Sequence, residues 1–188
     1  MKSIKRITIL SVLALAVGAM TLIPTTAGAA GASQIDRASR AALHSLISSN
    51  PKAAMLQTHA LAVLVFPSIT KAGFMVAVQR GTGALISGHR TLGYYETVGG
   101  SYGFQAGIQA YGYALFFLDR ESLHYLKGAR GWNVGTAPSL VVGNQGVSGS
   151  LGSLNLKKGI VAVFFNQRGL MGGLGLQGTK ITEFSPSY

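Results

Sequence analysis

Two-residue alternation of side-chain character runs along most of the chain after residue 73. In one stretch, every second position is serine, glycine or glutamine: Ser101, Gly103, Gln105, Gly107 and Gln109. Because successive side chains of a strand point to opposite faces, this stretch predicts a strand with one uncharged, partly bare face. Glycine is abundant and dispersed, with 26 in 188 residues, which predicts bulges, bends and close backbone approaches within sheets.

The first 29 residues have the pattern of a secretory signal peptide. Three basic residues precede an apolar run at residues 7–23, and the small residues AGA at 27–29 form a cleavage site. We therefore expect residues 30–188 to form a single domain, exported to a bacterial envelope and either periplasmic or peripherally bound to a membrane. An uncleaved N-terminal anchor is the alternative. Since the chain has no cysteine, we expect neither a disulfide nor a lipid-modified cysteine.

The charge balance is strongly basic, with a formal net charge of +11. Without the three basic residues of the predicted signal peptide, 13 basic and 5 acidic residues remain, a formal charge of +8. Two interpretations stay open: a basic surface for an anionic lipid or other polyanion, and general solubilising charge. Export and the lack of any helix-turn-helix or zinc-finger spacing argue against nucleic acid as a partner.

Three helices are predicted. Residues 33–49 place apolar side chains at helical spacing, and a second, short helix follows at 51–59 with Asn50 as its N-cap. A third helix begins after Asp119 and stops near Gly128.

The rest of the chain is predicted to be β-structure. The segment ALAVLVFP is expected to be a buried strand that ends at Pro67, and residues 68–73 are expected to form a turn. Several short strands with glycine-rich turns follow. The predicted fold class is α+β: two N-terminal helices packed on a strongly curved, mainly antiparallel sheet, open or partly closed, with one short internal helix.

No motif supports catalysis. Ser101 lies in a G-x-S-x-G pattern, but the residues after it alternate as a strand instead of forming the helix that a nucleophile elbow requires. The G-x-G-x-x-G pattern at residues 173–178 has no following helix, so we expect no dinucleotide site. The four histidines show no metal-ligand spacing and acids are few. We therefore expect no enzyme activity, no cofactor and no metal.

Basic side chains fall at or near predicted strand ends, where the turns of a meander bring them to one rim. We expect the following to bind lipid head groups: Lys71, Arg80, Arg90, Lys157, Lys158 and Arg168. Solvated turn charge is the alternative for each of them. Phe104, Phe116 and Phe117 are expected in the core.

Three separated blocks resemble the SYLF domain in its bacterial exported form. They are HALAVLVFPSITKAGFMVAVQRGTGAL, GYYETVGGSYGFQAGIQAYGYALFF and NQRGLMGGLGLQGTKI, within a resemblance that spans about residues 38–184. The resemblance implies a lipid-binding module without catalytic residues. It also implies that an N-terminal amphipathic helix contributes to membrane binding, and residues 33–49 are the nearest match.

The sequence thus predicts a non-enzymatic protein that binds anionic phospholipid or a membrane surface through a basic rim and apolar side chains. The alternatives are a structural envelope protein that binds a protein or glycan, and a small outer-membrane-associated barrel. The Ser101–Gln109 stretch is expected to be a packing seam covered by an N-terminal helix, with glycines that admit a close neighbour.

Overall fold

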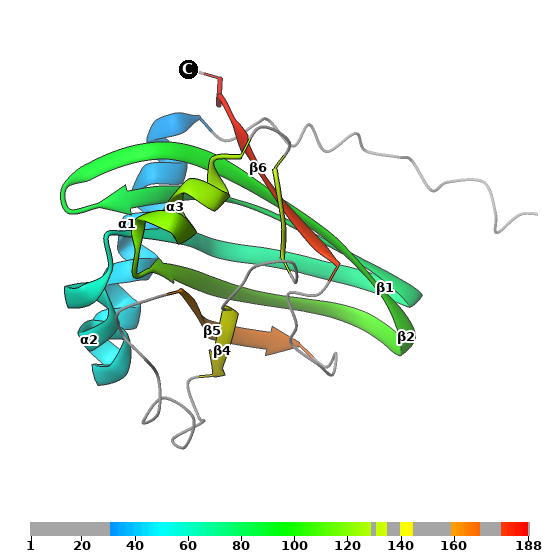
Figure 1. The fold of residues 1–188 in the computed structure, drawn as a ribbon. Helices are drawn as coiled ribbons and strands as arrows, with labels where there is room; N and C mark the ends of the chain where they lie inside the picture. Colours follow the sequence, from blue (N-terminus) through cyan, green and yellow to red (C-terminus); the bar gives the residue numbers. More distant parts are fainter. Residues whose placement is uncertain (1–30, 129–130, 135–139, 145–158, 170–177, 188) are drawn as a thin grey trace, which may run out of the picture.

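A computed structural model describes residues 31–128, 131–134, 140–144, 159–169 and 178–187. Within these residues the chain forms three helices and six strands (Figure 1): α1 Ala32–Ser49, α2 Pro51–His59, β1 Ala62–Ser87, β2 Arg90–Phe117, α3 Arg120–Leu126, β3 Trp132–Val134, β4 Leu140–Asn144, β5 Ile160–Gly169 and β6 Thr179–Phe184. The predicted signal peptide at residues 1–29 lies outside the described residues.

The helices begin where their capping residues predict. The side chain of Asn50 accepts hydrogen bonds from the backbone N–H groups of Lys52 and Ala53, which confirms it as the N-cap of α2. Asp119 caps α3 by accepting from the N–H of Ser122 at 2.7 Å. None of the helices in the described part of the chain is long and apolar enough to span a membrane.

β1 and β2 form one very long antiparallel hairpin, which the sequence does not predict. The pairing runs continuously from Ala62 opposite Phe117 to Ser87 opposite Arg90. The predicted strand end at Pro67 and the predicted turn at 68–73 are therefore wrong. The strand passes through Pro67 at a register shift, which is the kind of position where a missing N–H is tolerated.

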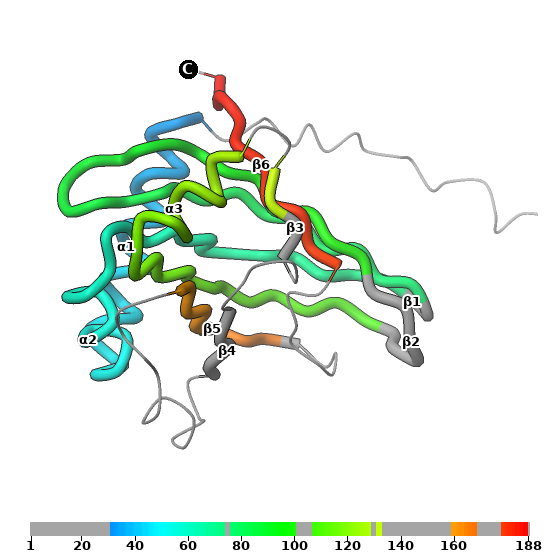
Figure 2. Tube along the Cα trace, viewed as in Figure 1, coloured from blue at the N-terminus to red at the C-terminus, as the bar shows by residue number. Residues whose placement is uncertain are grey.

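The hairpin folds back on itself at a second irregularity. The register shifts between Phe74 and Val76, where β2 contributes extra residues, and both strands bend there (Figures 1 and 2). The bend divides the sheet into two layers. The first layer contains residues 62–73 and 107–117 of the hairpin, and the second contains residues 76–87 and 90–102.

The remaining strands extend each layer. β5 pairs antiparallel with β2 in the first layer, and β4 pairs parallel with β5. β6 and then β3 continue the second layer in antiparallel pairing. The strand order is β3-β6-β2-β5-β4, with β1 paired to β2, and no ladder between described strands closes this sheet. The α+β class and the mainly antiparallel sheet are confirmed, whereas closure into a barrel is not found.

Two apolar clusters hold the fold together. One lies between the layers and includes Phe66, Tyr113 and Phe117 with Tyr95 and Trp132. The other joins α1 and α2 to the outer side of the first layer and to part of β1 in the second. The predicted core positions Phe116 and Phe117 are both buried, while the side chain of Phe104 lies outside the described residues.

The helices occupy one end of the molecule and the bend of the hairpin occupies the other (Figure 1). The predicted helix cover over the Ser101–Gln109 stretch is therefore wrong, because this stretch lies at the bend. Gly107 has nothing near the position of a Cβ, and its φ of +133° is one that residues with side chains rarely adopt. At this position glycine allows the backbone conformation that the bend requires, and no close neighbour explains it.

Candidate functional site

The outer faces of the sheet near the bend expose large apolar side chains. Val76 and Val78 on β1 are 56% and 57% exposed, and Ile108 on β2 is 69% exposed. Val98, on the neighbouring strand of the second layer, is also exposed. A helix covers part of the sheet at the opposite end, but these side chains face outward without such cover. We call Val76, Val78, Val98 and Ile108 the apolar bend surface.

The interior near the same bend is polar. Lys71, Gln79, Gln109 and Thr179 are buried there, at positions that alternate with the outward residues of their strands. The hydroxyl of Tyr111 donates to Gln79 Oε1 at 2.6 Å, and Gln79 Nε2 donates to Thr179 Oγ1 at 2.7 Å. Near the bend the outer faces therefore expose several large apolar side chains while the interior buries several polar ones, which departs from an ordinary soluble sheet.

A glycine makes the Gln79–Thr179 hydrogen bond possible. Gly99 stands between the two in register, opposite Gln79 on one side and Thr179 on the other. A Cβ at residue 99 would lie 2.6 Å from Gln79 Nε2 and 2.8 Å from Thr179 Oγ1. Both side chains therefore reach each other across the bare backbone of β2.

We expect Gly99→Ala to lower the free energy of unfolding by about 1–2 kcal/mol, because the methyl group breaks a buried hydrogen bond. Chemical denaturation measures the change. In a Gln79→Ala background only Thr179 Oγ1 still lies under 3 Å from the methyl group, and the hydrogen bond between Gln79 and Thr179 is already absent, so the added cost of Gly99→Ala should be smaller. An undiminished cost in that background would show that Gln79 is not the obstacle.

Burial also sets the acidity of the interior tyrosines. It raises the pKa of Tyr111 to about 12 and raises the pKa of Tyr113 further. Tyr113 donates to Thr97 Oγ1 at 2.8 Å, which links the two layers. These phenols remain neutral hydrogen-bond donors at physiological pH.

The structure does not bring the four described members of the predicted basic set to one rim. Lys71 points into the interior and is only 7% exposed. Arg80 is exposed on the second layer and forms an ion pair with Glu96, while Arg90 lies at the hairpin turn far from the bend. Arg168 is exposed on the outer side of the first layer. Lys157 and Lys158 lie outside the described residues.

The sequence did not predict the exposure of two groups of residues near the bend. Lys180 on β6 is exposed, and it pairs with Val98 at the margin of the apolar bend surface. Its position in the alternating segment TKITEF was the available signal. The exposure of Val76 and Val78 had no local signal, because alternation defines two faces without saying which one is covered.

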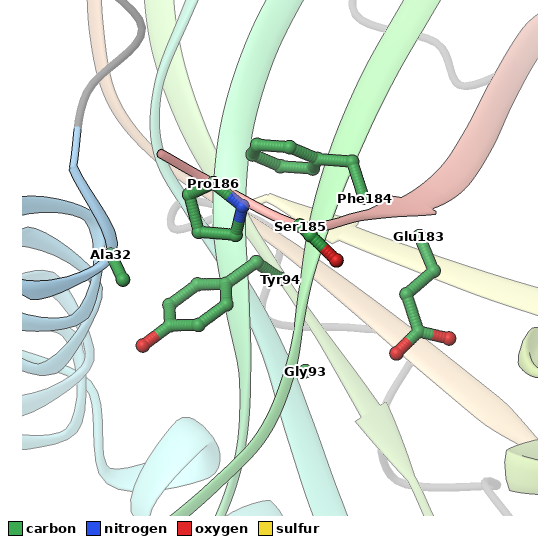
Figure 3. Close-up of a pocket in the computed structure, with 7 residues that line it drawn as sticks. All are labelled: Ala32, Gly93, Tyr94, Glu183, Phe184, Ser185 and Pro186. Atoms are coloured by element: carbon green, nitrogen blue, oxygen red, sulfur yellow. The ribbon is translucent and has the colours of Figure 1, made fainter. Parts of the chain in front are cut away.

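The described chain also has a shallow surface pocket of about 460 Å³, far from the bend (Figure 3). It lies between the start of α1 and the end of β6. Its lining residues are Ala32, Gly93, Tyr94, Glu183, Phe184, Ser185 and Pro186. In Figure 3 the Tyr94 ring and the Glu183 carboxylate point in different directions, so the pocket has no convergent polar groups. None of the predicted basic residues lines it.

The described residues contain no constellation typical of a catalytic or metal site. Ser101 lies within β2, so its backbone has the strand conformation that the sequence predicted and not an elbow. No group of three or more histidine or acidic residues within the described ranges is placed to hold a metal ion. The 173–178 glycine pattern lies outside these ranges apart from Gly178.

Comparison with known proteins gives a family for the second half of the chain. Residues 98–186 match the model of the Ysc84 family, described as "Las17-binding protein actin regulator", whose domain is the SYLF domain. No curated protein matches the chain significantly. The matched segment begins on β2 before the bend and extends beyond β6, so it contains much of both layers. The match supports the SYLF resemblance that the sequence motifs indicated over residues 98–186, whereas the block at residues 59–85 lies outside the matched segment.

Proposed function

We propose that this protein binds anionic phospholipid membranes peripherally, with the bend of the β1–β2 hairpin as the part that enters the membrane surface. The observation that carries the proposal is the apolar bend surface, where Val76, Val78 and Ile108 are more than half exposed. Exposed large apolar side chains that lie together are typical of an interaction site. Val78 and Val98 are diagonal neighbours on the second layer, and Ile108 lies on the first layer beside the bend. Valine and isoleucine side chains gain free energy when they leave water for the acyl region of a bilayer.

Basic side chains around this surface fit an anionic membrane. Lys180 and Arg80 lie beside Val98 in register, and Arg168 lies on the outer side of the first layer. Each basic group near an anionic surface adds about 1 kcal/mol of attraction, which salt screens. The pairing of Arg80 with Glu96 reduces its share, so Lys180 and Arg168 are the main cations in this proposal.

The first test is flotation of the protein with vesicles at low salt. We expect binding to vesicles that contain phosphatidylglycerol, weaker binding to pure phosphatidylcholine, and release by salt. The double variant Val76→Gln, Val78→Gln should reduce partitioning by about tenfold or more, because two apolar side chains no longer enter the bilayer. The matched control is Met55→Gln, Leu61→Gln, which removes two exposed apolar side chains near the helical end.

Equal losses in the two double variants would show that general surface hydrophobicity, and not the bend, drives binding. The absence of any preference for anionic vesicles at low salt would overturn the proposal as a whole. The proposal assigns no role in membrane binding to α1, because the apolar side of α1 packs on the sheet through Ile35, Leu43 and Leu46.

A protein partner is the second candidate, because the description of the family names one, Las17. The same apolar bend surface would then contact a protein. Its signature would be a specific partner that is captured without lipid, and that is lost in the Val76→Gln, Val78→Gln variant.

Export to a bacterial envelope, which rests on the signal-like residues 1–29, stays a prediction that N-terminal sequencing of the mature protein would test.

A further inference from the structure

Two buried polar side chains lie side by side in the interior behind the apolar bend surface. Lys71 of β1 is directly opposite Gln109 of β2, and cross-strand partners point to the same face of a sheet. That face is the one that looks between the layers, because Ile69 and Tyr111, two residues away on the same strands, belong to the interlayer core. Lys71 is 7% exposed and Gln109 is 4% exposed.

Lys71 has no anion within the described part of the chain. All five acids of the sequence are described, and none of them forms an ion pair with Lys71. Asp36 is bound to Arg40, Glu96 to Arg80, and Asp119 to backbone N–H groups at the start of α3. Lys71 also makes no hydrogen bond with a described residue. Lys71 Nζ is not among the solvent-inaccessible polar atoms that lack a partner, so the residue buries its carbon chain while its ammonium stays available to a ligand.

Gln109 has an unused acceptor at the same place. Its Oε1 is inaccessible to solvent and accepts no hydrogen bond in the described structure. The neighbouring polar groups are already engaged, since Gln79 accepts from Tyr111 and donates to Thr179. Most buried polar atoms of folded proteins have a partner, so the orphaned Gln109 Oε1, beside a cation with no counter-ion among the described acids, points to a missing ligand.

We propose that Lys71 and Gln109 bind a phosphate ester whose alcohol part carries a free hydroxyl group, as in a glycerol phosphate. The phosphate supplies the anion for the Lys71 ammonium, and the hydroxyl donates to Gln109 Oε1. The spacing of cross-strand partners suits these two groups, because a phosphate and a hydroxyl on one glycerol are also a few ångströms apart. This inference rests on the proposed membrane function, since the apolar bend surface would place the site next to lipid head groups.

The same chemistry has two sources, a phosphatidylglycerol head group and a free glycerol phosphate. Isothermal titration with the water-soluble dihexanoyl phosphatidylglycerol and with glycerol 3-phosphate distinguishes them. Tighter binding of the short-chain lipid identifies a head group as the occupant, whereas tighter binding of glycerol 3-phosphate identifies the free ester. Methyl phosphate, which has the anion but no free alcohol, is the third probe.

The decisive variant is Lys71→Met, which keeps most of the length of the unbranched side chain and removes its charge. We expect it to weaken binding of the preferred ester at least about tenfold, because a charge-assisted contact is lost. If Lys71 instead served only the fold, the variant would unfold more readily than the wild type. We expect its thermal stability to equal that of the wild type, because Lys71 forms no ion pair with any of the described acids.

Gln109→Leu tests the second contact separately. It should leave binding of methyl phosphate unchanged and should reduce the preference for the hydroxyl-bearing ester by about three- to tenfold. Arg37→Met is the control for general charge, because Arg37 is exposed on α1, to which the membrane proposal assigns no role. It should change neither quantity.

Flotation separates failure of this site from failure of the proposed function. If wild-type protein floats with anionic vesicles but binds none of the three phosphate probes, the interior site is wrong and the membrane proposal stands. If the probes bind but Lys71→Met binds them equally well, the assignment to Lys71 is wrong. If vesicles fail to bind while the probes bind through Lys71, the membrane proposal is wrong and a soluble ester is the ligand.

Discussion

Gly83→Ala is expected to destabilise the protein by about 3 kcal/mol or more, although it adds only one methyl group. The reason is the folding of β1 onto itself. A Cβ at residue 83 would collide with the backbone carbonyl of Val65 and would lie 2.8 Å from Cδ1 of Phe66, both in the other half of the same strand. The carbonyl of Val65 is further held by Ser39 of α1, whose Oγ donates to it at 3.2 Å.

The obstacle to a side chain at residue 83 is therefore backbone, which cannot rotate away as the end of a flexible side chain can. Chemical denaturation followed by circular dichroism measures the loss. Gly100→Ala is the matched control, because it lies in the same sheet, has its nearest neighbour 3.9 Å from the added methyl, and has no positive φ. Its stability should be unchanged or raised by up to about 1 kcal/mol. Equal losses at the two glycines would mean that general strand propensity matters and the crossing of β1 does not.

The second large effect is expected in alkaline solution. The free energy of unfolding should be about 4 kcal/mol lower at pH 11 than at pH 9 from three buried tyrosines alone. Burial raises the pKa of Tyr111 to about 12 and raises those of Tyr95 and Tyr113 further, with the charge of Glu183 also acting on Tyr95. In the unfolded chain a tyrosine ionises near pH 10.

Whether rising pH stabilises or destabilises the fold depends on which state, folded or unfolded, keeps its phenolic protons. Above pH 10 the unfolded chain releases the three phenolic protons while the folded protein retains them, so rising pH favours unfolding. The stabilisation is fully present below pH 10. Tyr111 ceases to add to the loss once the pH passes about 12, where it ionises in the folded protein as well.

Denaturation curves at several pH values between 8 and 11 measure this loss, and absorbance of the phenolate reports the ionisation. Tyr113→Phe should reduce the slope with pH by about one third, because one of the three groups no longer titrates. That variant also loses the hydrogen bond to Thr97, so its stability at pH 8 should be lower. An unchanged slope in Tyr113→Phe would contradict the assignment of the pH effect to the interlayer tyrosines.

The functional site shows why sequence reasoning reached only part of the answer. The sequence predicts that Lys71 lies on a surface rim, whereas the structure turns its side chain to the interior face, where the residue is 7% exposed. Its neighbours in sequence, Thr70 and Ala72, are exposed, so the alternation is as expected but the interior face carries the lysine. Which of two alternating faces is covered depends on a layer that lies far away along the chain.

The sequence by itself determined the starts of two helices, the fold class and the resemblance to the SYLF domain. Asn50 and Asp119 set the starts of α2 and α3, because their side chains accept hydrogen bonds from backbone N–H groups only two or three residues away. The α+β class followed from the two periodicities, and the SYLF resemblance from three blocks of residues. All of these are readable within short windows of sequence.

The tertiary structure alone decided how the strands are joined and which side chains they expose. Gly83 and Gly99 have no special backbone conformation, and their need for a bare Cα arises only when distant residues such as Val65 and Thr179 pack against them. The apolar bend surface and the buried Lys71–Gln109 pair have the same origin. They exist because one long hairpin folds over itself. Packing between residues far apart in the sequence stabilises this folded-over arrangement.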